Sequence, residues 1–132
     1  MAYILIVDED YLSAEIASDA LVQAGHTSGT VHDAQSARSL LAHKRPDLLL
    51  ISASLPGRSS AGLMRELRLS DEYHQLPIIL LGLQSAMLPS AQEVLPKPTM
   101  PAVLVGRVNA ILHAAGRPVH HWQATRSSAR RA

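Results

Sequence analysis

Three consecutive acidic residues, Asp8, Glu9 and Asp10, follow a run of apolar residues, and Lys97 stands between two prolines near the other end of the chain. Clustered carboxylates are ligands that magnesium and calcium prefer in proteins. A lysine ammonium group instead neutralises carboxylates or binds other anionic oxygen atoms. If the fold brings Lys97 to the acids, this group of residues predicts either a metal site or an ion pair.

Short apolar runs predict the strands that position these residues. Two of the runs are apolar at every position, as strands are when helices cover both faces of a parallel sheet. Because the carboxyl ends of parallel strands share one edge, we expect the three acids Asp8, Glu9 and Asp10 to meet Ser52, Gly82 and Lys97 there. The five predicted strands occupy residues 3–8, 27–31, 48–52, 78–82 and 94–95.

Apolar residues at helical spacing predict four helices between and after these strands. Asp10 and Asp33 are expected to cap the first two helices, Ser60 the third, and Pro101 suits the first turn of the last. Strand and helix thus alternate, which predicts a doubly wound α/β domain with helices on both faces of the sheet. The side chains expected to face the sheet are Leu12, Ile16, Ala20 and Ala24; Ala37, Leu40 and Leu41; Leu63, Met64 and Leu67; and Leu104, Val108, Ile111, Leu112 and Ala115.

Composition limits the classes of function. The 132 residues are 47% hydrophobic and contain no cysteine, which excludes a disulfide framework and a thiolate metal site. Residues 1–116 carry 8 basic and 11 acidic residues, whereas residues 117–132 carry four arginines and no acid. We therefore expect one mildly acidic domain over 1–116 and a basic, flexible tail over 117–132. The mildly acidic charge of residues 1–116 argues against nucleic acid binding. The absence of a long apolar run predicts a cytoplasmic protein without a membrane span.

Five short segments, in this order, resemble the receiver domain of bacterial response regulators over residues 3–115. The resemblance implies a flavodoxin-like α/β fold in which the five parallel strands have the order 2-1-3-4-5. The matching segments are residues 4–10 (Ile-Leu-Ile-Val-Asp-Glu-Asp), residues 46–51 (Pro-Asp-Leu-Leu-Leu-Ile), Leu55-Pro56-Gly57, Pro77-Ile78-Ile79 and Lys97-Pro98, whose peptide bond is expected to be cis.

The resemblance also implies roles for the residues at the strand ends. Asp8 and Glu9 match the acidic pair that holds magnesium in this family, and Lys97 matches the lysine that binds phosphoryl oxygens. The aspartate that accepts the phosphoryl group is replaced by Ser52, and the hydroxyl residue after the fourth strand by Gly82. Two working parts of a phosphorylation site are therefore missing.

Those replacements change the expected chemistry. The Ser52 hydroxyl is neutral at pH 7, has no general base beside it in the sequence, and removes one anionic metal ligand. We therefore expect an ion pair of Lys97 with the acids, at most weak magnesium binding by Asp8 and Glu9, and no other cofactor. Phosphotransfer from a histidine kinase is not expected, nor is enzymatic activity.

The sequence thus predicts a phosphorylation-independent receiver-like module that binds other proteins in bacterial signalling. Two alternatives remain open. The first is a phosphoacceptor that uses Asp8, Glu9 or Asp10 instead of Ser52. The second is a small-ligand or nucleotide-binding module at the strand ends, although no glycine-rich phosphate loop follows the first strand.

The spacing from Gly82 to Lys97 is shorter than the family usually has, which predicts that the helix expected over 83–92 is shortened or absent. A short helix would leave apolar surface uncovered next to the fourth strand. We expect that surface, together with the last helix, to form a homodimer or to dock a protein partner. The candidate interface residues are Leu83, Met87, Leu88, Leu104, Val108 and Ile111.

Overall fold

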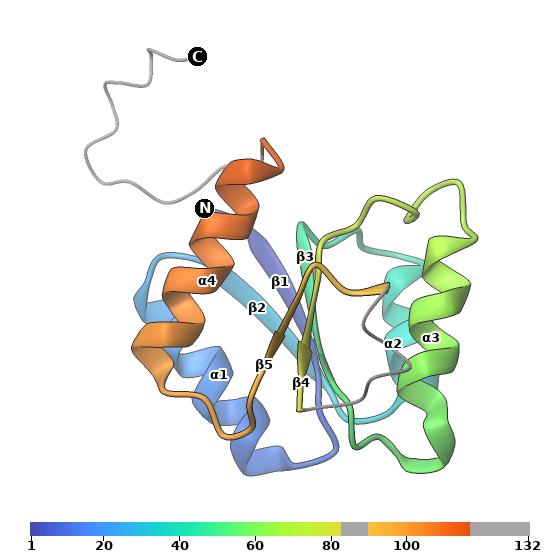
Figure 1. The fold of residues 1–132 in the computed structure, drawn as a ribbon, viewed down its shortest axis with the longest axis horizontal. Helices are drawn as coiled ribbons and strands as arrows, with labels where there is room; N and C mark the ends of the chain where they lie inside the picture. The colour runs from blue at the N-terminus through green and yellow to red at the C-terminus, as the bar shows by residue number, and fades with distance from the viewer. Residues whose placement is uncertain (83–89, 117–132) are drawn as a thin grey trace.

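A computed structural model describes residues 1–82 and 90–116, which form one five-stranded parallel sheet (Figure 1). The strand order is β2-β1-β3-β4-β5, and all four pairings are parallel, which confirms the predicted topology. β1 and β3 lie inside the sheet and consist almost entirely of buried residues. The strands are β1 (Tyr3–Val7), β2 (Thr27–Val31), β3 (Leu48–Ser52), β4 (Ile78–Leu81) and β5 (Glu93–Leu95).

Helices cover both faces of the sheet. Figure 1 shows α1 (Tyr11–Gln23) and α4 (Pro101–Ala114) side by side on one face, and α2 (Ala34–Leu41) and α3 (Ser59–Arg68) on the other. A single 3-10 turn, Pro56–Arg58, leads into α3. None of the helices in the described residues is long and apolar enough to cross a membrane.

Alternation along the strands divides the core into two layers. In β1, Leu5 and Val7 pack toward α2 and α3, whereas Ile4 and Ile6 pack toward α1 and α4. β3 alternates in the same way, because successive side chains of a strand point to opposite faces. Apolar residues at every position of both strands are therefore required by the two helical layers.

The rotation of α1 differs from the prediction. The predicted stripe was wrong, because Leu12 is 65% and Ile16 is 48% exposed, and the buried residues are Ala14, Ala17 and Leu21. Both sets have helical spacing, so periodicity alone does not choose between them. The Asp10 cap and the short connection from β1 determine which stripe meets the sheet, and two alanines let the helix approach closely.

The helix boundaries agree with most of the predicted signals. Asp10 and Asp33 cap α1 and α2, and Pro101 begins α4. Ser60 was expected to be a cap, but α3 begins at Ser59, and the buried Ser60 hydroxyl donates instead to the carbonyl oxygen of Ser52. The predicted shortening of the helix over 83–92 lies largely outside the described residues. Among those that are described, Ser90 has 3-10 conformation and residues 91 and 92 are not helical.

The predicted interface on the last helix disagrees with the structure. Leu104 is 4% and Val108 is 0% exposed, because both face the sheet within the α1 and α4 layer, and Ile111 packs against the same layer. Core residues offer a partner little or no surface, so the prediction was wrong for Val108, and only a small part of Leu104 remains accessible. The other interface candidates, Leu83, Met87 and Leu88, lie outside the described residues.

Candidate functional site

Asp8, Glu9, Ser52 and Lys97 meet at the carboxyl edge of the sheet, and we call them the Lys97 cluster. Asp8 and Glu9 directly follow β1, Ser52 ends the neighbouring β3, and Lys97 follows β5. The Lys97 Nζ atom lies 2.7 Å from Asp8 Oδ1, 3.0 Å from Ser52 Oγ and 3.4 Å from Glu9 Oε2. The predicted ion pair is therefore confirmed, and the long lysine side chain spans the end of β4 to form it.

Burial and backbone hydrogen bonds fix the cluster. Asp8 is 1% and Ser52 is 0% exposed. The backbone N–H of Asp10 donates to Asp8 Oδ1 at 2.9 Å, and the N–H of Ser54 donates to Ser52 Oγ at 3.1 Å. The Lys97-Pro98 peptide bond is cis, as predicted.

Asp10 does not take part in the cluster. Its carboxylate accepts hydrogen bonds from the backbone N–H of Leu12 at 3.0 Å and from the Ser13 hydroxyl at 3.2 Å, so it caps α1. The side chain is exposed. Only two of the three consecutive acids therefore face Lys97.

The contacts of the cluster favour the ionised forms of Glu9 and Lys97. Partial burial raises the pKa of the Glu9 carboxyl, but hydrogen bonds from its own backbone and Ser52, with the attraction of Lys97, outweigh burial and bring the pKa below its usual value. Burial lowers the pKa of Lys97, but the hydrogen bond to Asp8 and the charges of Asp8 and Glu9 raise it above its usual value. Lys97 is therefore a cation throughout the neutral range.

Glu9 is expected to make the domain sensitive to acid. Its folded pKa lies below the unfolded value of about 4.3, so its contribution is complete above that pH and is lost as the pH falls through the folded pKa. Because Glu9 is partly exposed, we expect no more than about 1 kcal/mol. Urea unfolding at neutral and at acidic pH measures how much unfolding free energy each protein loses on acidification, and this loss should be smaller in Glu9→Gln than in the parent. Glu15→Gln, at an exposed position on α1, is the control and should lose as much as the parent. Equal losses in all three proteins would contradict the prediction.

Gly82 lies at the same edge, after β4. Its backbone N–H donates to the carbonyl oxygen of Leu95 at 2.8 Å, and its φ is +98°. Side chains rarely adopt this backbone conformation, and a Cβ atom added here would lie 3.4 Å from the Cβ of Ala53. A serine or threonine at this position would therefore be strained in the present backbone.

Two carboxylate oxygens of the cluster are left over. Asp8 Oδ2 and Glu9 Oε1 are buried and have no hydrogen-bond partner. Magnesium commonly binds through one or two carboxylates and keeps several waters, so these two oxygens fit it. However, no group of three or more acidic, histidine or cysteine side chains in the described part of the chain is arranged to hold a metal ion. The donor set fits a weak cation site in competition with Lys97.

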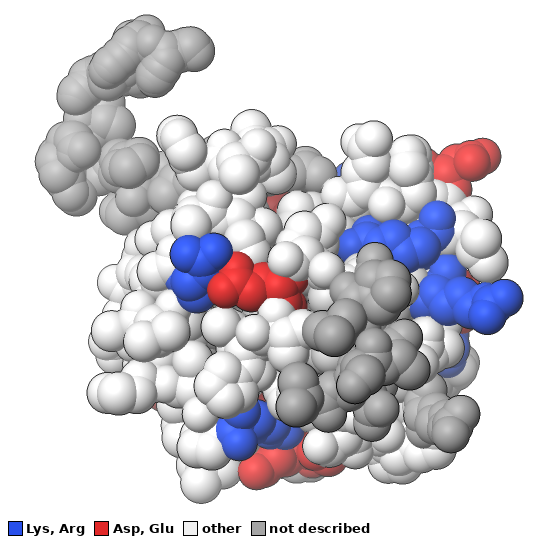
Figure 2. Space-filling view, viewed as in Figure 1, with Lys and Arg blue, Asp and Glu red and all other residues white. Residues whose placement is uncertain are grey.

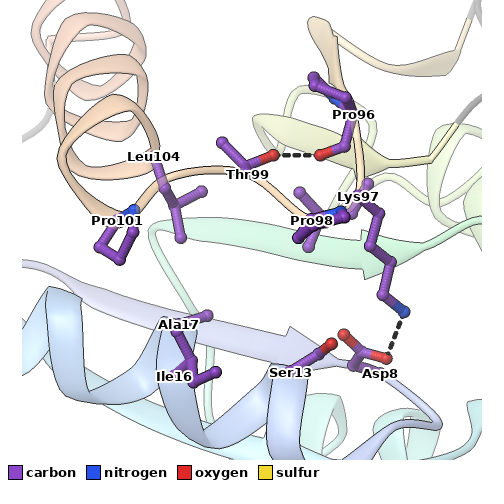
Figure 3. A pocket seen from close by; sticks show the side chains of 11 residues that line it. Asp8, Ser13, Ile16, Ala17, Pro96, Lys97, Pro98, Thr99, Pro101 and Leu104 are labelled. Atoms are coloured by element: carbon purple, nitrogen blue, oxygen red, sulfur yellow. Dashed lines mark hydrogen bonds and ion pairs between the residues drawn. The ribbon is translucent and has the colours of Figure 1, made fainter.

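A groove runs from the cluster between α1 and α4 (Figure 3). Its cavity has a volume of about 70 Å³, and Asp8 and Lys97 form its polar end. We call its remaining part the α1–α4 groove; it is lined by Ser13, Ile16, Ala17, Pro98, Pro101 and Leu104. This groove was not predicted from the sequence, because the predicted rotation of α1 placed Ile16 in the core.

His32 also lies at this edge and was missed. Its Nδ1–H donates to the Asp8 carbonyl oxygen, with 2.9 Å between the two atoms. Its ring stacks on Tyr11 with 3.6 Å between the centroids. The available signal was the position of His32 directly after β2, which neighbours β1. The histidine braces the backbone that carries Asp8.

Comparison with known families and proteins finds a consistent relationship. The family model for the response regulator receiver domain matches residues 4–109. The phosphate regulon transcriptional regulatory protein PhoB of Pseudomonas aeruginosa is 31% identical over 120 residues, which cover 86% of this chain and 52% of PhoB. The transcriptional regulatory protein CpxR of Escherichia coli is 30% identical, with 92% of this chain and 52% of CpxR covered. The chain thus spans about half the length of these relatives.

Solved structures show the same fold. The crystal structure of a putative response regulator from Chloroflexus aurantiacus has a TM-score of 0.79 and 31% identity, with 85% of this chain and 98% of the other covered. The chemotaxis response regulator CheY4 of Vibrio cholerae has a TM-score of 0.77, covering 85% of this chain and 99% of CheY4. At 23% identity, the second comparison supports the fold alone.

Proposed function

The chain belongs to the response regulator receiver domain family, and we propose that within this family it is a phosphorylation-independent receiver that acts by binding other proteins. The observation that supports this most is the contact of Lys97 Nζ with Asp8, Glu9 and Ser52 at once. A hydroxyl group, and not a carboxylate, stands at the end of β3 where an acceptor would be needed. The lysine is held by the acids of the site itself.

The hydrogen bonds of Ser52 argue against its use as a nucleophile. Its Oγ atom accepts from Lys97 Nζ and from the Ser54 backbone N–H. A serine must lose its proton to a general base when it attacks phosphorus, and Lys97 beside it is held as a cation that cannot accept that proton. Its side chain is also fully buried, which argues against modification by a protein kinase.

The backbone at Gly82 supports the same proposal. A phosphorylated residue at the end of β3 would need donors for its oxygens, and Gly82 has no side chain to offer one. Since φ is +98° there, a hydroxyl-bearing residue cannot be introduced without strain in this backbone. We infer that this edge of the sheet has lost the side-chain hydroxyl after β4 together with the acceptor carboxylate at the end of β3.

Magnesium, if bound, would be held by Asp8 and Glu9 through the two unpartnered oxygens. A bound magnesium ion supplies positive charge that stabilises anionic oxygens beside it. Lys97 already supplies positive charge at the same place, so the protein's own residues offset one of the two carboxylate charges without the ion. We propose that regulation depends on the availability of the protein partner.

The relatives suggest the setting of this module. PhoB and CpxR are named as transcriptional regulatory proteins, and the chain matches about half of each. We propose that this receiver acts in two-component signalling through a protein, either a separate partner or a domain joined to it. The acidic balance of residues 1–116 supports a protein and not a nucleic acid as the partner of this part of the chain.

Intact-mass measurement after incubation with magnesium and acetyl phosphate tests the proposal. We expect no added phosphoryl group on the parent chain. Ser52→Asp restores a carboxylate at the end of β3 and is expected to gain a phosphoryl group if that residue alone prevents the reaction. Ser54→Asp, at an exposed position two residues later, is the matched control and should gain none.

A phosphoryl group on the parent chain would overturn the proposal. The acceptor would then be located among Asp8, Glu9 and Asp10 by single substitutions to the corresponding amides. A thermal-shift measurement with nucleotides addresses the small-ligand alternative in the same samples. Stabilisation by a nucleotide that depends on Lys97 would favour that alternative over a purely protein-binding role.

A further inference from the structure

Exposed apolar side chains occur at Ile16, which lines the α1–α4 groove, and at Leu12 and Met100, which adjoin the lining residues Ser13 and Pro101 in the sequence. Leu12 is 65%, Ile16 is 48% and Met100 is 71% exposed. Figure 3 shows Ile16 and Ala17 of α1 on one side of the groove and Pro98, Pro101 and Leu104 on the other. Large apolar residues gathered around an open cavity are characteristic of a docking surface.

The charges beside this groove are acidic. Within α1 the charged residues are Glu15 and Asp19, and Asp10 precedes the helix; all three are exposed. The neighbouring cations are already paired, Lys97 with Asp8 and Arg107 with Glu93 at 2.7 Å each. In Figure 2 most of the surface over α1 and α4 is uncharged. The chemistry of this surface fits a segment that is both basic and apolar.

Residues 117–132 have that chemistry. They contain Arg117, Arg126, Arg130 and Arg131 and no acid, together with Val119 and Trp122, the single tryptophan of the chain. Trp122 offers a large apolar surface for a shallow cavity, and arginines pair well with exposed carboxylates.

The length and direction of the chain allow the contact. Figure 1 shows that α4 begins beside the end of β5 and runs back along the sheet, so Gly116 lies far from the groove. A helix of 14 residues is about 21 Å long, and six extended residues from Gly116 to Trp122 span about 20 Å. A segment of this length is sufficient for Trp122 to reach the level of Pro101 and Leu104, and for the later arginines to reach the acids around Asp10.

We propose that the α1–α4 groove is a docking surface occupied by residues 117–132 of the same chain, with Trp122 against Ile16 and the arginines beside the exposed acids. The bound segment covers the groove and competes with any protein partner that uses it. The inference does not depend on whether the Lys97 cluster accepts a phosphoryl group.

The fluorescence of the full chain tests this directly, because its single tryptophan lies in the segment. We expect a blue-shifted emission and an acrylamide quenching constant about twofold or more below that of a synthetic peptide of residues 117–132, as a segment docked for most of the time requires. Ile16→Glu should restore the peptide values. Val22→Glu, at a 54% exposed position of the same helix outside the groove, should leave the parent values unchanged.

Measurements at high salt and at several protein concentrations distinguish docking of the chain's own C-terminal segment from docking by a second copy. High salt should raise the quenching constant, because it screens the pairing of arginine with carboxylate. Met100→Glu is the second groove variant, in case Ile16→Glu fails to fold by circular dichroism. Peptide-like quenching in the parent, or a groove variant that folds and stays protected, overturns the proposal. Protection that appears only as protein concentration rises places the tail of a second copy in the groove and also overturns it.

Discussion

Replacing Lys97 with methionine is expected to lower the free energy of unfolding by about 3 kcal/mol, because it leaves Asp8 buried without its cation. Asp8 is 1% exposed, and its Oδ1 atom lies 2.7 Å from Lys97 Nζ. Methionine keeps most of the side-chain volume, so the change removes charge more than packing. Urea unfolding at pH 7 measures the effect.

Two further variants give this measurement its controls. Arg107→Met breaks the exposed pair with Glu93 and should cost below about 1 kcal/mol. In Asp8→Asn combined with Lys97→Met the fully buried carboxylate is gone and only the partly exposed Glu9 has lost its cation, so most of the stability should return. Magnesium should stabilise Lys97→Met more than the parent, because it replaces the lost cation at Asp8 and Glu9. A cost of Lys97→Met no larger than that of Arg107→Met would contradict the role assigned to the pair.

Replacing Arg68 with alanine is expected to cost a similar amount, about 3 kcal/mol, because one guanidinium group joins three parts of the fold. From the end of α3 it donates through Nε and Nη2 to the Ser90 carbonyl oxygen at 3.0 and 2.8 Å, and through Nη1 to that of Leu76 at 2.8 Å. Nη2 also reaches Gln92 Oε1 at 3.1 Å, and that oxygen accepts from the backbone N–H of Ile78. The connection that leads into β5 is thereby tied to α3 and to the start of β4.

Arg68→Lys distinguishes the planar guanidinium group from charge alone. A lysine cannot bridge these carbonyl groups in one plane, so we expect it to recover less than half of the loss. Arg65→Ala, at an exposed position one turn earlier on α3, should leave the unfolding free energy within about 0.5 kcal/mol of the parent. Full stability of Arg68→Lys would show that charge suffices and that the bridging geometry does not matter.

Both predictions concern contacts between residues far apart in the sequence. Lys97 lies 89 residues from Asp8, and Arg68 lies 22 residues from Ser90. The first contact follows from topology, since parallel strands end at one edge. The second has no counterpart in any periodic pattern, because a loop carbonyl oxygen has no sequence signature.

The sequence by itself determined the architecture and the edge at which the Lys97 cluster forms, although Asp10, which was expected with the other acids, caps α1 instead. Apolar runs such as Leu48–Ser52 must be strands covered on both faces, and alternation with helices then places Asp8, Ser52 and Lys97 at one edge. These features follow from local chemistry and connectivity. The replacement of an acidic acceptor by Ser52 is instead what the resemblance to the receiver family implies.

The tertiary structure alone decided how the elements are rotated and what their surfaces expose. Leu12 and Ile16 have the same helical spacing as a core stripe, but the cap at Asp10 and the path from β1 turn them outward and bury Ala14, Ala17 and Leu21. The same packing places Leu104 and Val108 inside. Periodicity defines which residues share a face, whereas only packing against the sheet decides which face is buried, and the α1–α4 groove is the result of that choice.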